Sequence, residues 1–192
     1  MKLVILDRDG TLNADSTDYI KSPEEWTPLP GALEAVARLN HAGWHVVLAS
    51  NQSGLGRGLF DVTALNAMHA KMNKLLAAVG GRVDAIFYCP HTPDDNCHCR
   101  KPEPGLFEQI GERFGIELKD VPTVGDSLRD MVAGAKAGCQ PHLVLTGRGA
   151  AFRGRALPES FPAGTQVHED LAAFVAWLLA AVPAFDHSVF HD

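Results

Sequence analysis

The stretch LVILDRDGT, residues 3–11, decides the fold, because a short apolar run passes directly into an acidic turn that contains glycine. The apolar residues predict a buried strand over 2–6, and the turn over 7–10 ends it. Side chains alternate along a strand, so Asp7 and Asp9 are expected to project to the same side of its end. The carboxyl end of this first strand is therefore the first candidate for a functional site.

Downstream of this strand, apolar β-branched runs alternate with helical patterns. Four further strands are expected at 44–49, 83–88, 121–124 and 142–145. Helices are expected at 31–41, 62–79, 104–114, 128–137 and 169–182. This alternation predicts βαβ crossovers and an α/β fold: a doubly wound, mainly parallel, Rossmann-like sheet with helices on both faces.

The length of the chain, 192 residues, suits one domain with a single hydrophobic core. We expect this domain over 1–182 and a loosely attached tail over 183–192. The turn over 15–26 is too short for a separate cap domain, so the site is expected to be open to solvent. The apolar stretches near the two ends are too short for a signal peptide or a membrane span, which makes the cytoplasm the expected location.

Charge limits the partners that this chain can bind. The net charge is −6, and no run of Lys and Arg is longer than the pair Arg100-Lys101. A surface that neutralises nucleic-acid phosphates is therefore not expected. The sequence predicts a small anionic ligand held by a few placed groups, no nucleic-acid or membrane partner, and a monomer.

The motif Asp7-Arg8-Asp9-Gly10-Thr11 places two carboxylates close together, where they repel unless a cation or a shared proton separates them. Hard oxygen ligands of this kind suit Mg²⁺, which binds through few carboxylates, waters and substrate phosphate. A phosphate held next to Asp7 would be placed for in-line attack and an aspartyl-phosphate intermediate. The alternative is a loop in which two solvated Asp residues make an Asx turn.

Three further polar segments follow predicted strands. After the second strand, Ser50 offers a hydroxyl to a phosphoryl oxygen, although Ser is also a common helix N-cap. After the third strand, Lys101 offers a compact cation to the phosphoryl group and Arg100 a fork for another oxygen, unless the pair is simply solvated. After the fourth strand, Asp126 is placed to complete the metal site and Asp130 to support it, unless Asp126 is an ordinary N-cap.

In this order and at four strand ends, these motifs resemble the haloacid dehalogenase superfamily of phosphohydrolases over essentially the whole chain. The resemblance implies that Asp7 is the nucleophile and a Mg²⁺ ligand, and that Asp9 is the acid/base and binds the metal through its backbone carbonyl. It assigns Ser50 and Lys101 to stabilisation of the phosphoryl group and Asp126 to the metal. The expected enzyme is a Mg²⁺-dependent phosphoric monoester hydrolase.

A cluster of cysteines lies in the loop after the third strand. The four cysteines of the chain are Cys89, Cys97, Cys99 and Cys139. With His91, the first three supply the Cys₃His set of a structural zinc site, which four protein ligands close completely. His98 could compete with His91, but it points the opposite way if the segment is extended. Free thiols, or a geometrically poor disulfide between Cys97 and Cys99, are the alternatives. A zinc ion here would hold the loop that delivers the basic pair.

The zinc loop is similar to that of two families, the D-glycero-D-manno-heptose 1,7-bisphosphate 7-phosphatases and the histidinol-phosphatases. The motifs that resemble the heptose enzymes are Asn51-Gln52-Ser53-Gly54, Arg57-Gly58, Tyr88-Cys89-Pro90-His91, Cys99-Arg100-Lys101-Pro102, Pro104-Gly105, and Gly125-Asp126 followed by Leu128 and Asp130-Met131. Three features depart from the heptose pattern. The short spacer between His91 and Cys97 resembles the histidinol enzymes, Ser50 stands where Thr is often found, and the loop over 15–19 is longer.

The motifs favour the heptose family, which implies removal of the 7-phosphate of D-glycero-D-manno-heptose 1,7-bisphosphate in the synthesis of heptose precursors for lipopolysaccharide. The alternatives are a histidinol-phosphate phosphatase of histidine biosynthesis and, outside enzymes, a zinc-stapled phosphate-binding module. A bisphosphate needs a second anion site away from Mg²⁺, for which Arg100 is the first candidate and Arg57 the second. The other expected substrate contacts are Asn51, Gln52, Ser53, Asp15 and Asp18.

Overall fold

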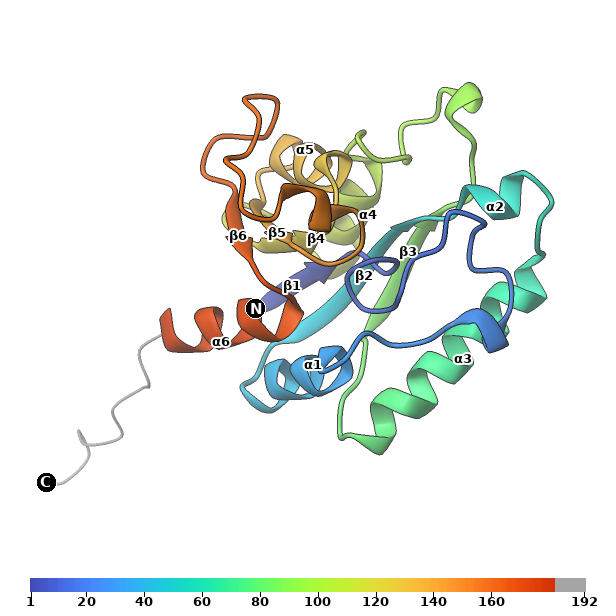
Figure 1. The fold of residues 1–192 in the computed structure, drawn as a ribbon, viewed down its shortest axis with the longest axis horizontal. Coiled ribbons are helices and arrows are strands. Elements are labelled where there is room, and N and C mark those ends of the chain that lie inside the picture. The colour runs from blue at the N-terminus through green and yellow to red at the C-terminus, as the bar shows by residue number, and fades with distance from the viewer. Residues whose placement is uncertain (182–192) are drawn as a thin grey trace, which may run out of the picture.

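The computed structural model describes residues 1–181, so the tail predicted over 183–192 lies outside the described residues. Six parallel strands form one sheet in the order β3-β2-β1-β4-β5-β6 (Figure 1). The strands are β1 (Leu3–Leu6), β2 (His45–Asn51), β3 (Ala85–Cys89), β4 (Pro122–Gly125), β5 (Gln140–Val144) and β6 (Gln166–His168). Because β1 pairs with β2 on one side and β4 on the other, the strand order reverses at β1. Open α/β sheets bind their ligands at such a switch point.

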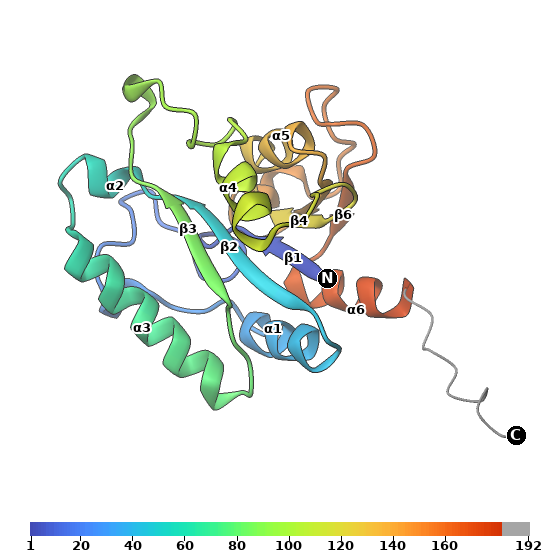
Figure 2. The same cartoon turned by 180° about the vertical axis from the view of Figure 1, so that it is seen from behind.

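Helices cover both faces of the sheet. They are α1 (Ala32–His41), α2 (Ser53–Gly56), α3 (Val62–Ala78), α4 (Gly105–Phe114), α5 (Leu128–Lys136) and α6 (Leu171–Ala181). Helices α1, α3 and α6 lie on one face, and α4 and α5 lie on the other (Figure 2). Along β1, Val4 and Leu6 pack into the first layer, whereas Leu3 and Ile5 pack into the second. Every residue of β1 is therefore buried, which explains its uninterrupted apolar run.

The predicted α/β class, parallel sheet and helices on both faces are confirmed, with small shifts at the ends of the elements. The sequence pattern does not predict β6 or α2. Strand β6 is short, has one apolar residue between two polar ones, and is held at the sheet edge by pairing with β5. Helix α2 is a single turn rich in glycine, which helices disfavour. The Gly56 N–H anchors it by donating to the Pro90 carbonyl at 3.0 Å.

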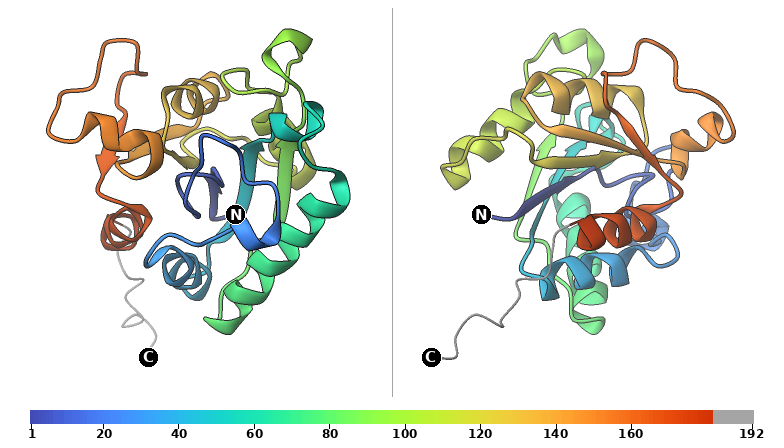
Figure 3. Two further views of the ribbon diagram at one scale, coloured as in Figure 1. Left: turned by 45° about the vertical axis from the view of Figure 1, so that its right-hand side comes forward. Right: turned by 90° about the vertical axis from the view of Figure 1, so that its left-hand side faces the viewer.

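The connections leave the carboxyl edge of the sheet open. Between β1 and α1 the only helical segment is the 3₁₀ turn η1 (Pro23–Glu25), so no separate cap domain covers that edge in the described chain. Two other 3₁₀ turns, η2 (Pro93–Asp95) and η3 (Gly147–Phe152), lie in loops after β3 and β5. Helix α6 packs beside α1, away from this edge (Figure 3). No helix in residues 1–181 has the length and apolarity needed to cross a membrane.

Candidate active site

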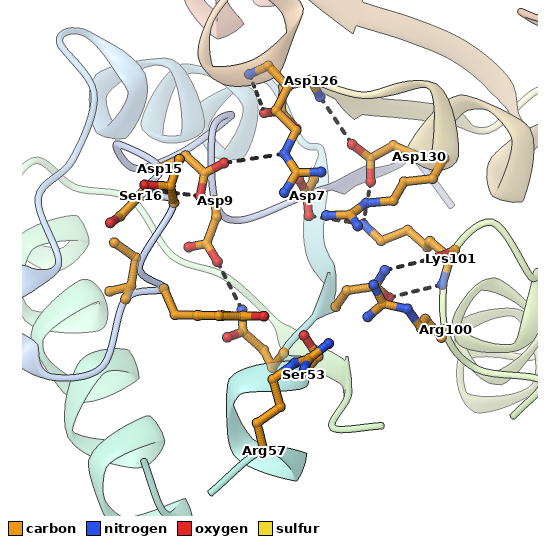
Figure 4. A pocket seen from close by; sticks show the side chains of 17 residues that line it. Asp7, Asp9, Asp15, Ser16, Ser53, Arg57, Arg100, Lys101, Asp126 and Asp130 are labelled. Carbon is orange, nitrogen blue, oxygen red and sulfur yellow. Dashed lines mark hydrogen bonds and ion pairs between the residues drawn. The ribbon is translucent and has the colours of Figure 1, made fainter. Parts of the chain in front are cut away.

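One pocket lies at the carboxyl ends of β1, β2 and β4 and beside the loop after β3 (Figure 4). Its acidic groups and single lysine are Asp7, Asp9, Asp126, Asp130 and Lys101. Its arginines are Arg57, Arg100, Arg129 and Arg148. The loop after β1 adds a further wall of residues, namely Asp15, Ser16, Thr17, Tyr19 and Ile20. The pocket therefore joins a compact acidic group to several guanidinium groups.

Asp7 follows β1 directly, and its backbone N–H donates to the carbonyl of Val124 in β4 at 2.9 Å. Its side-chain Oδ1 accepts a hydrogen bond from Lys101 Nζ at 2.9 Å. Burial and the negative charge of Asp130 raise the pKa of Asp7 to about 6, although Lys101 counteracts part of this effect. At neutral pH the carboxylate is therefore mostly ionised, as a nucleophile must be.

Lys101 is only 2% exposed and is surrounded by oxygen atoms. Its Nζ lies 2.7 Å from Asp130 Oδ1 and donates to the Ala49 carbonyl at 2.7 Å. Burial opposes the positive charge, but Asp130 and Asp7 raise the pKa of Lys101, which stays protonated. The Asn51 side chain accepts from the Lys101 N–H at 2.9 Å and donates to its carbonyl at 3.1 Å. Asn51, predicted as a substrate contact, thus also holds the backbone of Lys101.

Asp126 and Asp130 come from the start of α5. Asp130 Oδ2 accepts hydrogen bonds from the Ser127 hydroxyl at 2.9 Å and the Ser127 N–H at 3.1 Å, a capping box that begins the helix. Asp126 Oδ2 accepts from the Arg148 N–H at 2.9 Å. Burial and the neighbouring carboxylates raise the pKa of Asp126 to about 9. Gly10 has φ +86°, and any side chain there would collide with the Asp126 carboxylate.

The acidic residues of the pocket fit a divalent cation. One oxygen from each of Asp7, Asp126 and Asp130 lies within 4.8 Å of the others. Lys101 pairs with Asp7 and Asp130, whereas Asp126 makes no ion pair within residues 1–181, and burial together with the neighbouring carboxylates raises its pKa. Hard oxygen atoms with uncompensated charge are the donors that Mg²⁺ prefers. The family resemblance predicts that Asp9 binds the metal through its backbone carbonyl. Among side chains, the third member of the acidic group beside Asp7 and Asp126 is Asp130.

The Asp9 carboxylate is held by a separate network. Its Oδ1 accepts from Arg8 Nε and from Asn13 Nδ2, each at 2.9 Å, and its Oδ2 accepts from Gln52 Nε2 at 3.2 Å. Burial favours the protonated form, but Arg8 and the amide donors hold the pKa of Asp9 below its usual value. Arg8 is completely buried, and its Nη1 lies 3.2 Å from His69 Nε2 in α3. The sequence does not predict this role for Arg8, because an arginine between two acids carries no local sign of burial.

Lys101 lines the pocket, whereas Ser50 does not. Its hydroxyl is buried, accepts a hydrogen bond from Gln52 Nε2 at 2.7 Å, and does not line the pocket in the described chain. Gln52 does line the pocket and contacts both Ser50 and Asp9. The structure thus brings Asp7, Asp9 and Lys101 together and leaves Ser50 behind the Gln52 amide.

The predicted substrate contacts fall into two groups. Those that line the pocket are Asp15, Asn51, Gln52, Ser53, Arg57 and Arg100. Asp18 does not line it: this residue is exposed, and its N–H donates to the Ser16 hydroxyl at 3.1 Å. Ser16 and its neighbours in this loop also line the pocket, and the sequence does not predict them, because only the folded chain defines the path of the loop.

Two pocket arginines, Arg129 and Arg148, are also missed, because isolated basic residues carry no local signal. Arg148 Nε lies 3.7 Å from Asp15 Oδ2, which links η3 to the loop after β1. Burial lowers the pKa of Arg100, and the positive charges of Arg129 and Arg57 lower it further. Arg129 and Arg57 are therefore each close enough to Arg100 for their positive charges to disfavour its own.

A second cluster lies in the loop after β3. The ligand atoms within 4.8 Å of one another belong to Cys89, His91, Cys97 and Cys99. Cys97 Sγ is 3.5 Å from Cys89 Sγ and 3.7 Å from Cys99 Sγ, with no disulfide. Those two spacings are close to the roughly 3.8 Å expected between thiolates around tetrahedral zinc, whereas the third, from Cys99 Sγ to Cys89 Sγ, is shorter at 2.7 Å. His98 turns away, and its Nε2 lies 2.8 Å from Glu108 Oε2. The four donors therefore fit a closed zinc site.

Comparison with known proteins connects this geometry to a family. The HAD-hydrolase-like family model matches residues 98–174, which include Lys101, Asp126 and Asp130. The chain is 58% identical over 179 residues to the D-glycero-β-D-manno-heptose-1,7-bisphosphate 7-phosphatase of Bordetella bronchiseptica, covering 93% of this chain and 98% of that protein. It is 52% identical to the enzyme of the same name from Pseudomonas aeruginosa, covering 92% and 97% of the two chains.

Solved structures agree with these relatives. The crystal structure of D,D-heptose 1,7-bisphosphate phosphatase from B. bronchiseptica, complexed with magnesium and phosphate, has a TM-score of 0.89 and 57% identity, and the match covers 95% of this chain and 100% of that one. The corresponding enzyme from Burkholderia thailandensis has a TM-score of 0.71 and 51% identity, covering 94% and 99%. The chain therefore belongs to the D-glycero-β-D-manno-heptose-1,7-bisphosphate 7-phosphatase family of HAD-like hydrolases.

Proposed function

We propose that this protein is a Mg²⁺-dependent phosphatase that removes the 7-phosphate of D-glycero-β-D-manno-heptose 1,7-bisphosphate. The observation that carries the proposal is the ionised Asp7 carboxylate, held at 2.9 Å by the buried Lys101 ammonium beside Asp126 and Asp130. The names of relatives more than half identical to this chain support the substrate and the β anomer. The product would enter the synthesis of heptose precursors for lipopolysaccharide.

In the first step, an Asp7 oxygen attacks phosphorus in line with the departing C7 oxygen, so that the P–O bond to the sugar breaks and an aspartyl-phosphate forms. Asp9 donates a proton to the departing oxygen. Lys101 balances the negative charge of the transferring phosphoryl group. Mg²⁺, which Asp7, Asp126 and the Asp9 carbonyl would hold, supplies further charge neutralisation and orients the phosphate.

In the second step, Asp9 takes a proton from water, which attacks the aspartyl-phosphate and releases inorganic phosphate and free Asp7. The low pKa of Asp9 suits this base role directly, since its carboxylate is ionised. In the first step, the negative charge of the bound phosphate opposes the effect of Arg8 and raises the proton affinity of Asp9. The Ser50 hydroxyl acts through Gln52, to which it is hydrogen-bonded.

The Cys₃His cluster is proposed to bind a structural zinc ion. Four protein ligands leave no open position for a catalytic water. The cluster ends at Cys99, directly before Arg100 and Lys101, so the metal would hold the segment that delivers both cations. Thiolate ligands must stay reduced, which supports a cytoplasmic location.

The test measures phosphate release by the purified protein with Mg²⁺. Substrates are the α and β anomers of heptose 1,7-bisphosphate and, as the alternative from the sequence analysis, histidinol phosphate. We expect the highest kcat/KM for the β anomer and no release after Mg²⁺ is chelated. An equal or higher kcat/KM for histidinol phosphate would overturn the substrate, and release that persists in Asp7→Asn would overturn the mechanism.

A further inference from the structure

Helix α3 carries one polar side chain in the stripe that faces the core. Its buried residues are Leu65, Met68, His69, Met72 and Leu76, and His69 is only 9% exposed. A buried imidazole costs free energy unless it is hydrogen-bonded. No step of the proposed reaction uses His69, and within residues 1–181 it does not line the pocket. Its hydrogen-bond partner therefore decides what this side chain does.

That partner is the buried Arg8, whose Nη1 lies 3.2 Å from His69 Nε2. A guanidinium group only donates hydrogen bonds, so the imidazole must accept with Nε2 and carry its proton on Nδ1. Burial and the charge of Arg8 lower the pKa of His69 to about 4, which keeps the ring neutral near pH 7. His69 is thus held in one protonation state and one tautomer.

The other donors of Arg8 point at the acid/base and its support. Nε donates to Asp9 Oδ1 at 2.9 Å, and Nη2 donates to Asp9 Oδ2 at 3.2 Å and to Gln52 Oε1 at 3.3 Å. The second contact of Nη1 is the sulfur of Met68 at 4.0 Å, which is a weak acceptor. His69 is therefore the strong acceptor for the one guanidinium nitrogen that does not contact Asp9 or Gln52.

Helix α3 is also tied to the segment that follows β1. Lys71 Nζ donates to the carbonyls of Pro23 and Trp26, each at 2.7 Å. The buried stripe of α3 packs into the apolar layer on the same face of the sheet. The planar group of Arg8 is therefore fastened to a carboxylate at one edge and to an anchored helix at the other, which leaves it little freedom to turn away from Asp9.

We propose that His69 is a positioning residue for the acid/base, because it accepts from Arg8 and so fixes the guanidinium that orients both oxygens of Asp9. This inference rests on the proposed function, in which Asp9 gives and takes the transferred proton. General acid/base catalysis needs the carboxylate oxygen within hydrogen-bond reach of the reacting atoms. His69 touches no reacting atom and no substrate, so its loss slows turnover and leaves substrate binding unchanged.

The test compares wild type with His69→Leu, which removes the acceptor, and with His69→Gln, whose Oε1 can accept from Arg8. Leu and Gln have similar helix propensities, so neither weakens α3 by itself. In His69→Leu we expect kcat for heptose 1,7-bisphosphate to fall about 10-fold, since a misplacement of about 1 Å costs up to about 100-fold. KM should stay within about 2-fold of wild type. His69→Gln should recover most of kcat.

Met72→Leu is the matched control, because Met72 is buried in the same stripe of α3 and its sulfur makes no hydrogen bond to Arg8 within residues 1–181. Its kcat should match that of wild type even if its Tm falls. Unchanged kcat in His69→Leu, an equal loss in His69→Gln, or an equal loss in Met72→Leu would overturn the inference. A loss in His69→Leu that lies mainly in KM would do the same.

The ¹⁵N NMR signals of the His69 ring give a readout that needs no substrate and no folded Leu variant. Their absence from the spectrum of His69→Gln assigns them. We expect a neutral ring with its proton on Nδ1, and a proton on Nε2 would overturn the inference by itself. Failure of the proposed function looks different: wild type would then release no phosphate from heptose 1,7-bisphosphate, while the His69 ring would still show the expected tautomer.

Discussion

At the scale of single residues, the buried Arg8 is the least expected feature of the site. It is fully buried beside the partly exposed Asp9 and contacts that carboxylate with Nε at 2.9 Å and Nη2 at 3.2 Å. The same Nη2 group donates to Gln52, and Nη1 faces His69. Arg8 is thus a positioning residue, because it holds the proposed acid/base without touching Asp7.

Replacing Arg8 by Met should therefore destabilise the protein. Breaking one partner of a buried ion pair costs on the order of 3 kcal/mol, because Asp9 keeps its charge and loses its counter-ion. For a chain of this size that loss lowers Tm by roughly 6–12 °C. Thermal melts in EDTA measure the change. The matched control is Arg82→Met, which removes an exposed partner of Asp84 and should cost less than about 1 kcal/mol. Similar Tm shifts for the two variants would contradict the role assigned to Arg8.

Asp7→Asn should abolish turnover and leave the fold intact, because the amide keeps the shape and loses the nucleophilic charge. Burial and the charge of Asp130 raise the pKa of Asp7, which means that the ionised carboxylate destabilises the folded protein. Replacing it by a neutral amide should therefore give a metal-free variant with a Tm no lower than that of wild type. Phosphate release and thermal melts test both statements. Asp120→Asn makes the same chemical change at an exposed residue with φ 62°, a conformation that Asn tolerates, and should retain full activity.

Asp9→Asn should slow turnover without abolishing formation of the aspartyl-phosphate, in contrast to Asp7→Asn. Loss of a general acid/base costs about 10²–10⁴-fold in rate, and the intact Asp7 should still accept the phosphoryl group slowly. Trapping of labelled phosphate on the protein after a rapid quench measures the intermediate. Complete absence of label in Asp9→Asn, with label present in wild type, would show that this residue is needed before attack rather than for proton transfer.

At the scale of elements, two segments carry the cations and carboxylates into place. The segment from the end of β4 into the first turn of α5 presents Asp126, Arg129 and Asp130 to the pocket. The cysteine loop presents Arg100 and Lys101 to the same pocket. Polar bonds such as the Ser127–Asp130 capping box, and the proposed zinc, help to hold these two segments.

The zinc proposal predicts one zinc ion per chain in the purified protein. Cys97→Ser removes one of the four ligands and should lower zinc content, increase proteolysis within 90–99, and lower kcat/KM. Cys139→Ala is the control, because Cys139 is buried in the apolar layer beneath α4 and lies outside the cysteine cluster. The Cys139→Ala protein should therefore keep its full zinc content. Metal analysis and limited proteolysis measure these effects. Unaltered loop protection after complete zinc removal would contradict a structural role.

At the scale of the whole molecule, the sheet separates two apolar layers, and one polar pair lies at its edge. His142 in β5 is completely buried, and its Nδ1 lies 2.9 Å from His168 Nε2 in β6. Phe174 and Trp177 of α6 pack against both rings. Burial, with a smaller contribution from His168, lowers the pKa of His142 to about 3. The folded protein therefore keeps this pair neutral.

This burial predicts a loss of stability in acid. Below the ordinary histidine pKa of 6.5, the unfolded chain binds a proton that folded His142 does not, so the free energy of unfolding falls as the pH drops from 6.5 toward 3. The contribution of His142 is about 2 kcal/mol at pH 5. Urea melts at pH 7 and pH 5, followed by far-UV circular dichroism, measure it. His142→Phe should reduce the difference, whereas the exposed His41→Gln should not. An unchanged pH dependence in His142→Phe would refute this account.

By itself, the sequence determined the layers and the chemistry at their edge. Alternating apolar runs predicted the parallel sheet, because periodicity is a local property of the chain. Asp7, Lys101 and Asp126 could be assigned because each directly follows a strand or its loop, and parallel strands end at one edge. The Cys₃His set was recognisable because its four members lie close together in sequence, within one short loop.

Only the tertiary structure decided which side chains reach the pocket. Arg129 and Arg148 reach the pocket from elements distant in sequence from β1. Arg8 contacts His69 of α3, and β6 is held in the sheet by its pairing with β5. Ser50 has the expected residue type yet lies behind Gln52. The physical reason is common to all of them: burial, orientation and unpaired charge arise from contacts between segments far apart in the chain, which no local pattern contains.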